Sequence, residues 1–189
     1  IRDPEMSRGL GDVYKRQSSV NTPDVYSMSS MTEILQWCER TGKSYWEYVK
    51  ECEDSDIWDY LQEVWKTMQD AVKRGLEQEG VLPGPLNLRR KASTYYIRAS
   101  GYKQSLQSRG LVFAYALAVS EENASGGVIV TAPTCGSCGV MPAVLYHLAK
   151  SREFSDTRIL RALATAGLVG NIVKTNASIS GAEVGCQGE

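Results

Sequence analysis

The chain has 189 residues, of which 42% are hydrophobic and 23% charged, and its formal net charge is −1. This balanced charge gives no indication of a nucleic acid or a membrane surface as a partner. No apolar run reaches the roughly 18 residues that a membrane-spanning helix needs. The apolar content is sufficient for one sizeable core, so we expect one domain, or one and a part.

The thiols are few, widely spread and odd in number. The five cysteines are Cys38, Cys52, Cys135, Cys138 and Cys186. This is not the pattern of a disulfide framework, and it favours a reducing, cytoplasmic compartment with free thiols. The single histidine, His147, excludes a histidine-rich zinc site, and we expect it to be a packing or surface residue.

The N-terminal stretch, residues 1–29, shows no regular hydrophobic period. We interpret residues 1–17 as a disordered start or as linker sequence foreign to the protein, and the remainder as a loop that leads to Ser30 or Thr32 as a helix cap. The folded domain is therefore expected at residues 30–189.

Helical patterns dominate as far as residue 125. Residues 31–43, with Gly42 as a stop, and residues 44–52 predict short helices. The clearest pattern is an apolar stripe at spacings of three and four, which predicts a helix with one buried face over residues 56–80, capped by Gly80. The stripe comprises Ile57, Leu61, Val64, Trp65, Met68, Ala71, Val72 and Leu76. Further helices are expected within residues 92–107 and 108–125.

Residues 81–93 separate two of these helices and contain two prolines, which indicates a loop. The loop carries Arg89, Arg90 and Lys91. One interpretation is a solvated basic turn. The other places these cations near an acidic small molecule or a partner subunit.

The composition changes at residue 125, after which Gly, Ala, Ser, Thr and Val dominate. Residues 126–134 contain a β-branched run that predicts a strand, or an extended buried segment before Pro133. Residues 140–150 predict a helix with Pro142 in its first turn, and residues 157–175 predict a helix of small residues. The expected fold is therefore mostly α, a helical domain with glycine-rich loops and little or no sheet.

A Gly-rich loop leads into the helix at residue 140. Its sequence, TAPTCGSCGV, covers residues 131–140. Gly136 and Gly139 permit backbone angles that are closed to other residues. Thr134, Ser137 and the backbone N–H groups could converge on a carboxylate or phosphate at the helix N-terminus. No Gly-Lys-Ser/Thr follows, so this is not a Walker loop.

The same loop contains the spacing Cys135-Gly-Ser-Cys138. By residue counting alone, three readings stay open: a metal clip, a redox pair, or small residues in a tight structural loop. A structural zinc site needs four ligands, and the chain has no second CxxC. A thioredoxin-like motif needs a βαβ setting that the sequence does not predict.

The final stretch, VGNIVKTNASISGAEVGCQGE, covers residues 169–189 and groups polar residues among small apolar ones. They are Lys174, Asn176, Ser178, Ser180, Glu183, Cys186 and Gln187. Polar groups at this density are costly to bury unless they meet each other or a ligand. They are either helix-cap and turn residues or the wall of an active site.

Two motifs together resemble those of a known family. TAPTCGSCGVMPAVLY and GLVGNIVKTNASISGAEVGCQGE are similar, in order and spacing, to the alpha chain or alpha domain of iron–sulfur-dependent L-serine dehydratases. TEILQWCERTGKSYWEYV and FAYALAVSEENAS also resemble that family, so the likeness covers about residues 30–189. It implies a lyase that converts L-serine to pyruvate and ammonia. In such enzymes an iron of a [4Fe–4S] cluster acts as a Lewis acid on the serine hydroxyl.

The resemblance also implies roles for single residues. Cys186 matches a cluster ligand, and the other two cluster cysteines are expected beyond residue 189, so we expect the catalytic domain to be incomplete at its C-terminus. Substrate contacts are expected from Thr134, Cys135, Gly136, Ser137, Asn176 and Ser178. Lys174 is a candidate base, or a cation that holds the substrate carboxylate, and Glu183 is the second candidate base.

The partners that the resemblance implies are L-serine, a β-type subunit and further copies of the chain in a homo-oligomer. Three alternatives stay open at this point. The first is a related cluster enzyme that eliminates sulfide from cysteine. The second is a non-catalytic CxxC module that binds a metal or serves redox chemistry. In the third, this length of chain is inactive alone because two cluster ligands are absent.

Overall fold

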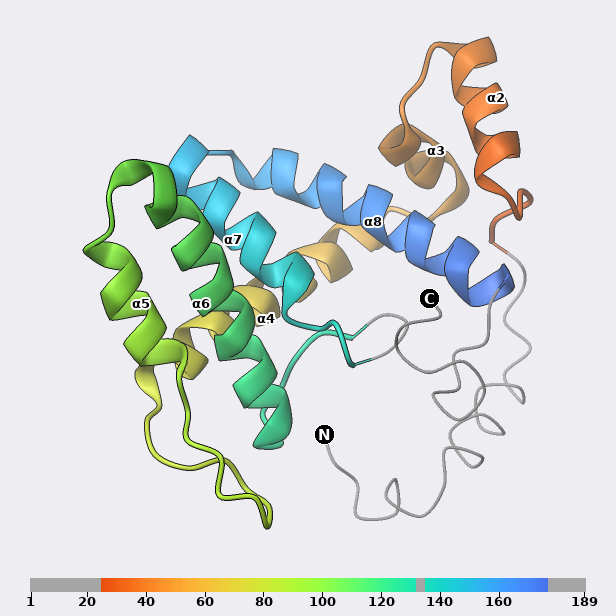
Figure 1. Cartoon of the computed structure of the whole chain (residues 1–189). Helices are drawn as coiled ribbons and strands as arrows, with labels where there is room; N and C mark the ends of the chain where they lie inside the picture. The colour runs from red at the N-terminus through yellow and green to blue at the C-terminus, as the bar shows by residue number, and fades with distance from the viewer. Residues whose placement is uncertain (1–24, 132–134, 177–189) are drawn as a thin grey trace.

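A computed structural model describes residues 25–131 and 135–176, and these residues form seven helices (Figure 1). They are α2 (Met31–Thr41), α3 (Tyr45–Cys52), α4 (Ile57–Glu77), α5 (Ala92–Ser100), α6 (Gln104–Ala124), α7 (Val140–Arg152) and α8 (Asp156–Asn176). The predicted mostly-α fold is confirmed. None of these seven helices is both long enough and apolar enough to cross a membrane.

The extended run that begins at residue 126 does not form a strand in its described part, residues 126–131. Ile129 and Val130 pack against the core, as expected for the extended-segment alternative, and the structurally described part of the chain offers no neighbouring strand to pair with them. The only β-type pairing among the described residues is one antiparallel bridge between Val81 and Arg89. It closes the hairpin-like loop that projects between α4 and α5 (Figure 1).

The ends of α2 lie where capping residues in the sequence predict them, whereas the C-terminal end of α4 does not. The Ser30 hydroxyl accepts the N–H of Glu33, while the Glu33 carboxylate accepts the N–H of Ser30, which is a capping box at the start of α2. Gly42 ends α2 with φ of 70°, as predicted. Helix α4, however, ends at Glu77 rather than at Gly80, whose φ of 101° serves the turn of the following loop.

Helix α4 lies at the centre of the core. It contacts α6, α7 and α8, and Figure 1 shows it passing behind these helices. The buried residues of its stripe are Leu61, Trp65, Met68, Ala71 and Val72. The other helices contribute buried partners that include Tyr115, Val119, Leu145, Tyr146, Ile159, Leu163 and Leu168. The stripe predicted from sequence is therefore the face that the fold buries.

The basic turn before α5 is not solvated as a whole. The side chain of Arg90 is only 7% exposed and forms an ion pair with Glu122 of α6. Next to it, Glu121 accepts the backbone N–H of Lys91 at 2.6 Å, so an acidic side chain of α6 satisfies the N-terminus of α5. Both carboxylates lie about thirty residues further along the chain, where no local spacing could reveal them.

Helices α4 and α6 cross at backbone contact. A Cβ atom at Gly75 would lie 2.2 Å from the carbonyl oxygen of Ala118, so only glycine fits there. Helix α6 presents Ala114 and Ala118, both fully buried, on its packed side. Small residues on both helices therefore set the distance between α4 and α6.

We expect Gly75→Ala to lower the free energy of unfolding by about 1–3 kcal/mol, because the added methyl group forces the two backbones apart. Gly167→Ala is the matched control: Gly167 lies inside α8 with no described atom within 4 Å of a Cβ. There the substitution should raise stability by roughly 0.5–1 kcal/mol through backbone entropy. Urea unfolding followed by circular dichroism measures both. Equal effects at the two sites would contradict the proposed crossing.

Candidate functional site

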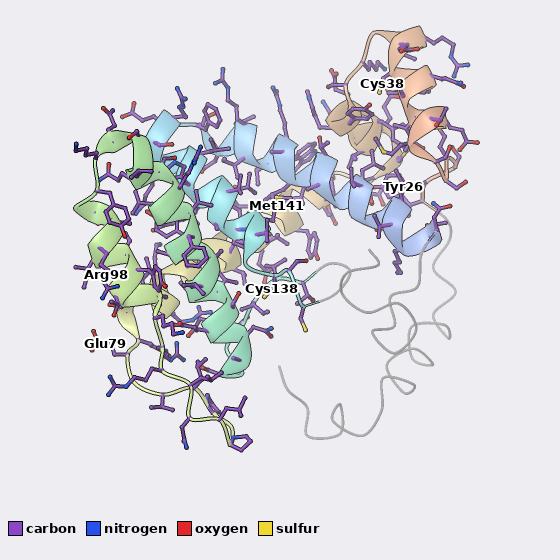
Figure 2. The ribbon with its side chains drawn as sticks, viewed as in Figure 1. Tyr26, Cys38, Glu79, Arg98, Cys138 and Met141 are labelled. Carbon is purple, nitrogen blue, oxygen red and sulfur yellow. The ribbon has the colours of Figure 1, made fainter. Side chains whose placement is uncertain are left out.

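The residues that the two motifs single out lie at two helix ends. One is the loop 135–139 before α7, and the other is the stretch 174–176 that ends α8. Helices α7 and α8 diverge from their short connection, and both of these ends lie on the side away from it (Figure 1). Figure 2 shows Cys138 where the chain enters α7, and Tyr26 beside the far end of α8.

The two cysteines of the CxxC spacing have different surroundings. Cys135 is exposed, whereas Cys138 is only 7% exposed and belongs to the core. Burial raises the pKa of the Cys138 thiol, and the neighbouring Cys135 adds to the effect. Asn123 of α6 holds the loop by donating its side-chain N–H to the carbonyl oxygen of Cys135 at 3.4 Å. This geometry favours the structural reading of Cys138.

Gly139 is required for space and not for its backbone angles. Its φ is −81°, which any residue adopts, in contrast to the expectation from sequence. A Cβ atom at this position would lie 2.4 Å from the carbonyl oxygen of Ala116 in α6. The start of α7 is therefore seated directly on α6, and this contact was not visible in the sequence.

The N-terminus of α7 has few backbone donors left for an anion. The N–H of Val140 donates to the carbonyl oxygen of Ser137 at 3.0 Å, and the N–H of Ala143 donates to that of Gly139 at 3.2 Å. Pro142 has no N–H. Side chains of the loop, such as the exposed Ser137, are therefore better placed than the backbone to meet a ligand.

A polar groove of about 590 Å³ lies at the end of α8. It runs between the last turns of α8 and residues 25–29, which precede α2. Its lining includes Tyr26, Ser27, Glu53, Asn171, Lys174 and Thr175. Asn176 fastens the two sides together, because its Nδ2 donates to the carbonyl oxygen of Ser29 at 2.9 Å. Residues 25–29, which the sequence placed in the N-terminal loop, thus form one wall of this groove.

Tyr26 is a groove residue that the sequence analysis missed. Its hydroxyl donates to Oε1 of Glu53 at 2.6 Å. Burial, followed by this hydrogen bond, raises the pKa of Tyr26 far above its usual range, so the hydroxyl stays a donor at any physiological pH. A lone tyrosine in an irregular segment carries no periodic signal, and its partner lies 27 residues away.

Lys174 is exposed at the rim of the groove. An exposed ammonium group at this position can contact a negatively charged ligand directly. The geometry therefore favours the second role predicted for it, a cation that holds a carboxylate. Asn176 is exposed as well.

Several predicted site residues fall beyond the structural description. Thr134, Ser178, Glu183 and Cys186 lie outside the described residues. Within residues 25–131 and 135–176, no group of three histidine, cysteine, aspartate or glutamate side chains is arranged to hold a metal ion. His147 is half-buried, and its Nε2 lies 2.7 Å from Oγ of Ser108, as expected of a packing histidine between α6 and α7.

Comparison with known proteins decides the family. The model of the serine dehydratase alpha chain family matches residues 15–189. This chain belongs to that family. The match includes the Cys135 loop and the stretch that begins at Lys174, so the two helix ends described above both carry family sequence.

Individual relatives agree with the family match. The chain is 44% identical to L-serine dehydratase 1 of Escherichia coli K12 over 184 residues, which is 92% of this chain and 40% of that protein. It is 40% identical to L-serine dehydratase of Haemophilus influenzae, with 93% and 40% covered, and 41% identical to L-serine dehydratase of Streptomyces coelicolor, with 87% and 38% covered. The chain thus spans about 40% of the length of these relatives.

The surroundings of the loop predict an order of thiol modification. With a neutral alkylating reagent, Cys135 should react before Cys138, because Cys138 is buried and its raised pKa leaves less thiolate at a given pH. The alkylation rate of Cys138 should approach that of an ordinary free thiol as the pH rises above about 8.5. Peptide mass spectrometry after timed labelling measures both rates. In urea the two cysteines should react alike, and equal rates in the native protein would contradict the described loop.

Proposed function

We propose that this chain forms part of an L-serine ammonia-lyase, which removes water from L-serine and releases pyruvate and ammonia. The observation that carries the proposal is the family match over residues 15–189, which includes both motifs. The relatives named L-serine dehydratase support it, since the chain aligns with them over most of its own length. The fold contributes two polar helix ends on one side of a helical body.

In this proposal Lys174 binds the carboxylate of L-serine. Its exposed ammonium group lies at the rim of the groove, next to the hydroxyl-bearing Thr175. An ammonium group attracts a carboxylate as a compact charge with three donors. This assignment leaves Glu183, outside the described residues, as the candidate base for the poorly acidic α-proton.

Asn176 has a more specific role than its residue type suggests. Both recorded hydrogen bonds of its amide nitrogen go to backbone carbonyl oxygens, those of Ser29 and Ile172, each at 2.9 Å. The amide nitrogen has two hydrogens, so these contacts use its donor capacity. We therefore propose that Asn176 meets the substrate through Oδ1, which can accept a hydrogen bond from the serine ammonium group.

The Gly-rich loop supplies the remaining proposed contacts. Cys135, Gly136 and Ser137 are exposed before α7, and the Ser137 hydroxyl can donate to a carboxylate or accept from the ammonium group. Thr134 and Ser178 are proposed to act with them. In this arrangement the loop and the end of α8 hold the substrate from two helices, so that its orientation depends on how those helices pack.

We also propose a cofactor and partner subunits for this chain. A [4Fe–4S] cluster with Cys186 as one ligand follows from the family resemblance. The described residues do not supply a ligand group, so we derive no step through the cluster. A β-type partner is suggested by the family description as an alpha chain, and we propose a homo-oligomer as well. The four cysteines of the described residues are free, which fits a reducing, cytoplasmic setting.

The activity can be tested with the protein that carries this sequence, prepared without oxygen. We expect pyruvate and ammonia from L-serine, together with the absorbance of an iron–sulfur cluster. Cys186→Ser should abolish turnover and lower the iron content, whereas Cys52→Ser in α3 should change neither. Incubation with an iron chelator should remove activity in parallel with iron. Turnover that survives complete loss of iron, or faster release of sulfide from L-cysteine than of pyruvate from L-serine, would contradict the proposal.

The role of Lys174 has its own test. Lys174→Met should raise KM for L-serine by about tenfold or more while lowering kcat less, because it removes a charged contact to the carboxylate. Lys66→Met on α4 is the control, since it removes an exposed lysine on a different helix with the same change in net charge. Steady-state pyruvate formation gives both constants. If kcat collapses and KM stays unchanged, Lys174 acts as the base instead.

A further inference from the structure

Three charged side chains meet where the chain leaves α6. Arg74 of α4, Arg90 before α5 and Glu122 of α6 form what we call the Arg–Glu cluster. Nε of Arg74 lies 3.0 Å from Oε2 of Glu122, and Nη1 of Arg90 lies 3.5 Å from its Oε1. One carboxylate thus joins three parts of the chain that are 16 to 48 residues apart in sequence.

The cluster also holds the first residues after α6. Nη2 of Arg74 donates to the carbonyl oxygen of Val128 at 2.6 Å, and Nη2 of Arg90 donates to Oγ of Ser125 at 2.5 Å. Each arginine therefore binds Glu122 with one nitrogen and the outgoing segment with another. Because the guanidinium group is planar and rigid, these paired contacts fix the direction in which residues 125–128 run.

The backbone of this segment is seated against the same carboxylate. The N–H of Gly127 donates to the carbonyl oxygen of Glu122 at 2.8 Å. A Cβ atom at Gly127 would lie 2.7 Å from Oε2 of Glu122, so a side chain there would displace the carboxylate from Arg74. The preceding Gly126 has φ of 76°, which favours glycine, and it turns the chain away from α6.

Helix α6 also contacts the loop at residues 135–139. Asn123, one residue after Glu122, donates to the carbonyl oxygen of Cys135, and Ala116 lies against Gly139. The candidate loop therefore leaves the last turn of α6 and returns to it. The described residues on either side, 125–131 and 135–139, are thus both anchored to α6.

Burial makes the cluster sensitive to the loss of a single charge. The side chains of Glu122 and Arg90 are 3% and 7% exposed, while that of Arg74 is 39% exposed. Removing one partner of a buried ion pair leaves the other charge uncompensated, which is far more costly than losing a surface pair. Loss of the Glu122 charge should therefore release both arginines, and with them Ser125 and Val128.

We propose that the Arg–Glu cluster is a positioning device that sets the path of residues 125–131 and so holds the loop of Cys135, Gly136 and Ser137 in place. Among the described residues, no hydrogen bond or ion pair joins the cluster to those loop residues, so the cluster acts through the segment and not on a ligand. The consequence for substrate binding rests on the proposed function. The ordering of the loop by the cluster is independent of the proposed function.

The test uses the protein that carries this sequence with Glu122→Gln, and with Glu63→Gln on the exposed face of α4 as the matched control. Alkylation of the native protein is followed by peptide mass spectrometry, with Cys52 of α3 as an internal reference. In Glu122→Gln we expect the rate at Cys138 relative to Cys52 to rise by at least about tenfold. Glu63→Gln should leave this ratio unchanged.

Two milder variants keep the test decisive if Glu122→Gln does not fold. Ser125→Ala removes the Arg90 contact to the segment, together with the hydrogen bond that the Ser125 hydroxyl donates to the carbonyl oxygen of Glu121. Arg74→Lys keeps the positive charge but loses the guanidinium group that binds both the Glu122 carboxylate and the carbonyl oxygen of Val128. Both should raise the Cys138 to Cys52 ratio by a smaller factor. A Cys138 to Cys52 ratio that stays at the wild-type value in every folded variant overturns the proposal. This includes an equal rise at both cysteines, which leaves the ratio unchanged and reports general loosening of the fold.

Kinetics separate this inference from the proposed function. In the folded variants we expect KM for L-serine to rise more than kcat falls, with Arg74→Lys closer to wild type than Glu122→Gln. If the wild-type protein forms no pyruvate from L-serine, the proposed function fails while the thiol ratio still decides the positioning role. If pyruvate forms and KM does not follow the thiol ratio, the loop is positioned by the cluster but does not bind serine.

Discussion

The close approach of other segments to α6 is the constraint on which the rest of the structure depends. At four places a glycine meets this helix or belongs to it: Gly75 faces Ala118, Gly139 faces Ala116, Gly127 faces Glu122, and Gly110 of α6 faces Ala99 of α5. At each of them a Cβ atom would lie under 3 Å from its neighbour. Helices at such distances cannot slide past one another without steric clash, so α6 fixes the positions of α4, α5 and the start of α7.

This constraint reaches the candidate site through the start of α7. Gly139 seats the loop of Cys135 to Cys138 on α6, and the buried charges near the end of α6 hold the chain that leads to it. The loop therefore owes its position to packing and ion pairing on one helix. A loop held in this way can present side chains to a ligand with little further loss of entropy on binding.

The end of α8 is supported differently. Its groove depends on residues 25–29, which two hydrogen bonds hold in place. Asn176 donates to the carbonyl oxygen of Ser29, and the Tyr26 hydroxyl donates to the carboxylate of Glu53, the residue after α3. Helix α8 in turn packs on α3 and α4. Helices α7 and α8 thus both pack on α4, so a change in that core would alter the geometry of both candidate regions.

The buried carboxylates of the described chain lie where α6 meets the loop before α5. Glu121 and Glu122 are the buried charged residues of the described core, and both belong to this helix. Glu121 satisfies the start of α5 through Oε1, while its Oε2 is buried without a partner among the described residues. Local sequence shows two adjacent glutamates on a helix, which usually indicates a solvated face. Their burial is favourable because Arg74 and Arg90 pair with Glu122, and the backbone N–H of Lys91 donates to Glu121.

The sequence by itself determined the mostly helical fold and the buried stripe of α4, because helix formation depends on periodicity and caps within a few residues of each other. It placed the boundary between α5 and α6 at residue 107, whereas α5 ends at Ser100 and α6 begins at Gln104. It also determined the family, since the two motifs are continuous stretches of chain. Tertiary structure alone decided why Gly139 is glycine, that Arg90 is buried, that Tyr26 belongs to the groove and that Lys174 stays exposed within the described chain. Each of these depends on partners from distant segments, and the distance between two helices is set by packing that no local pattern records.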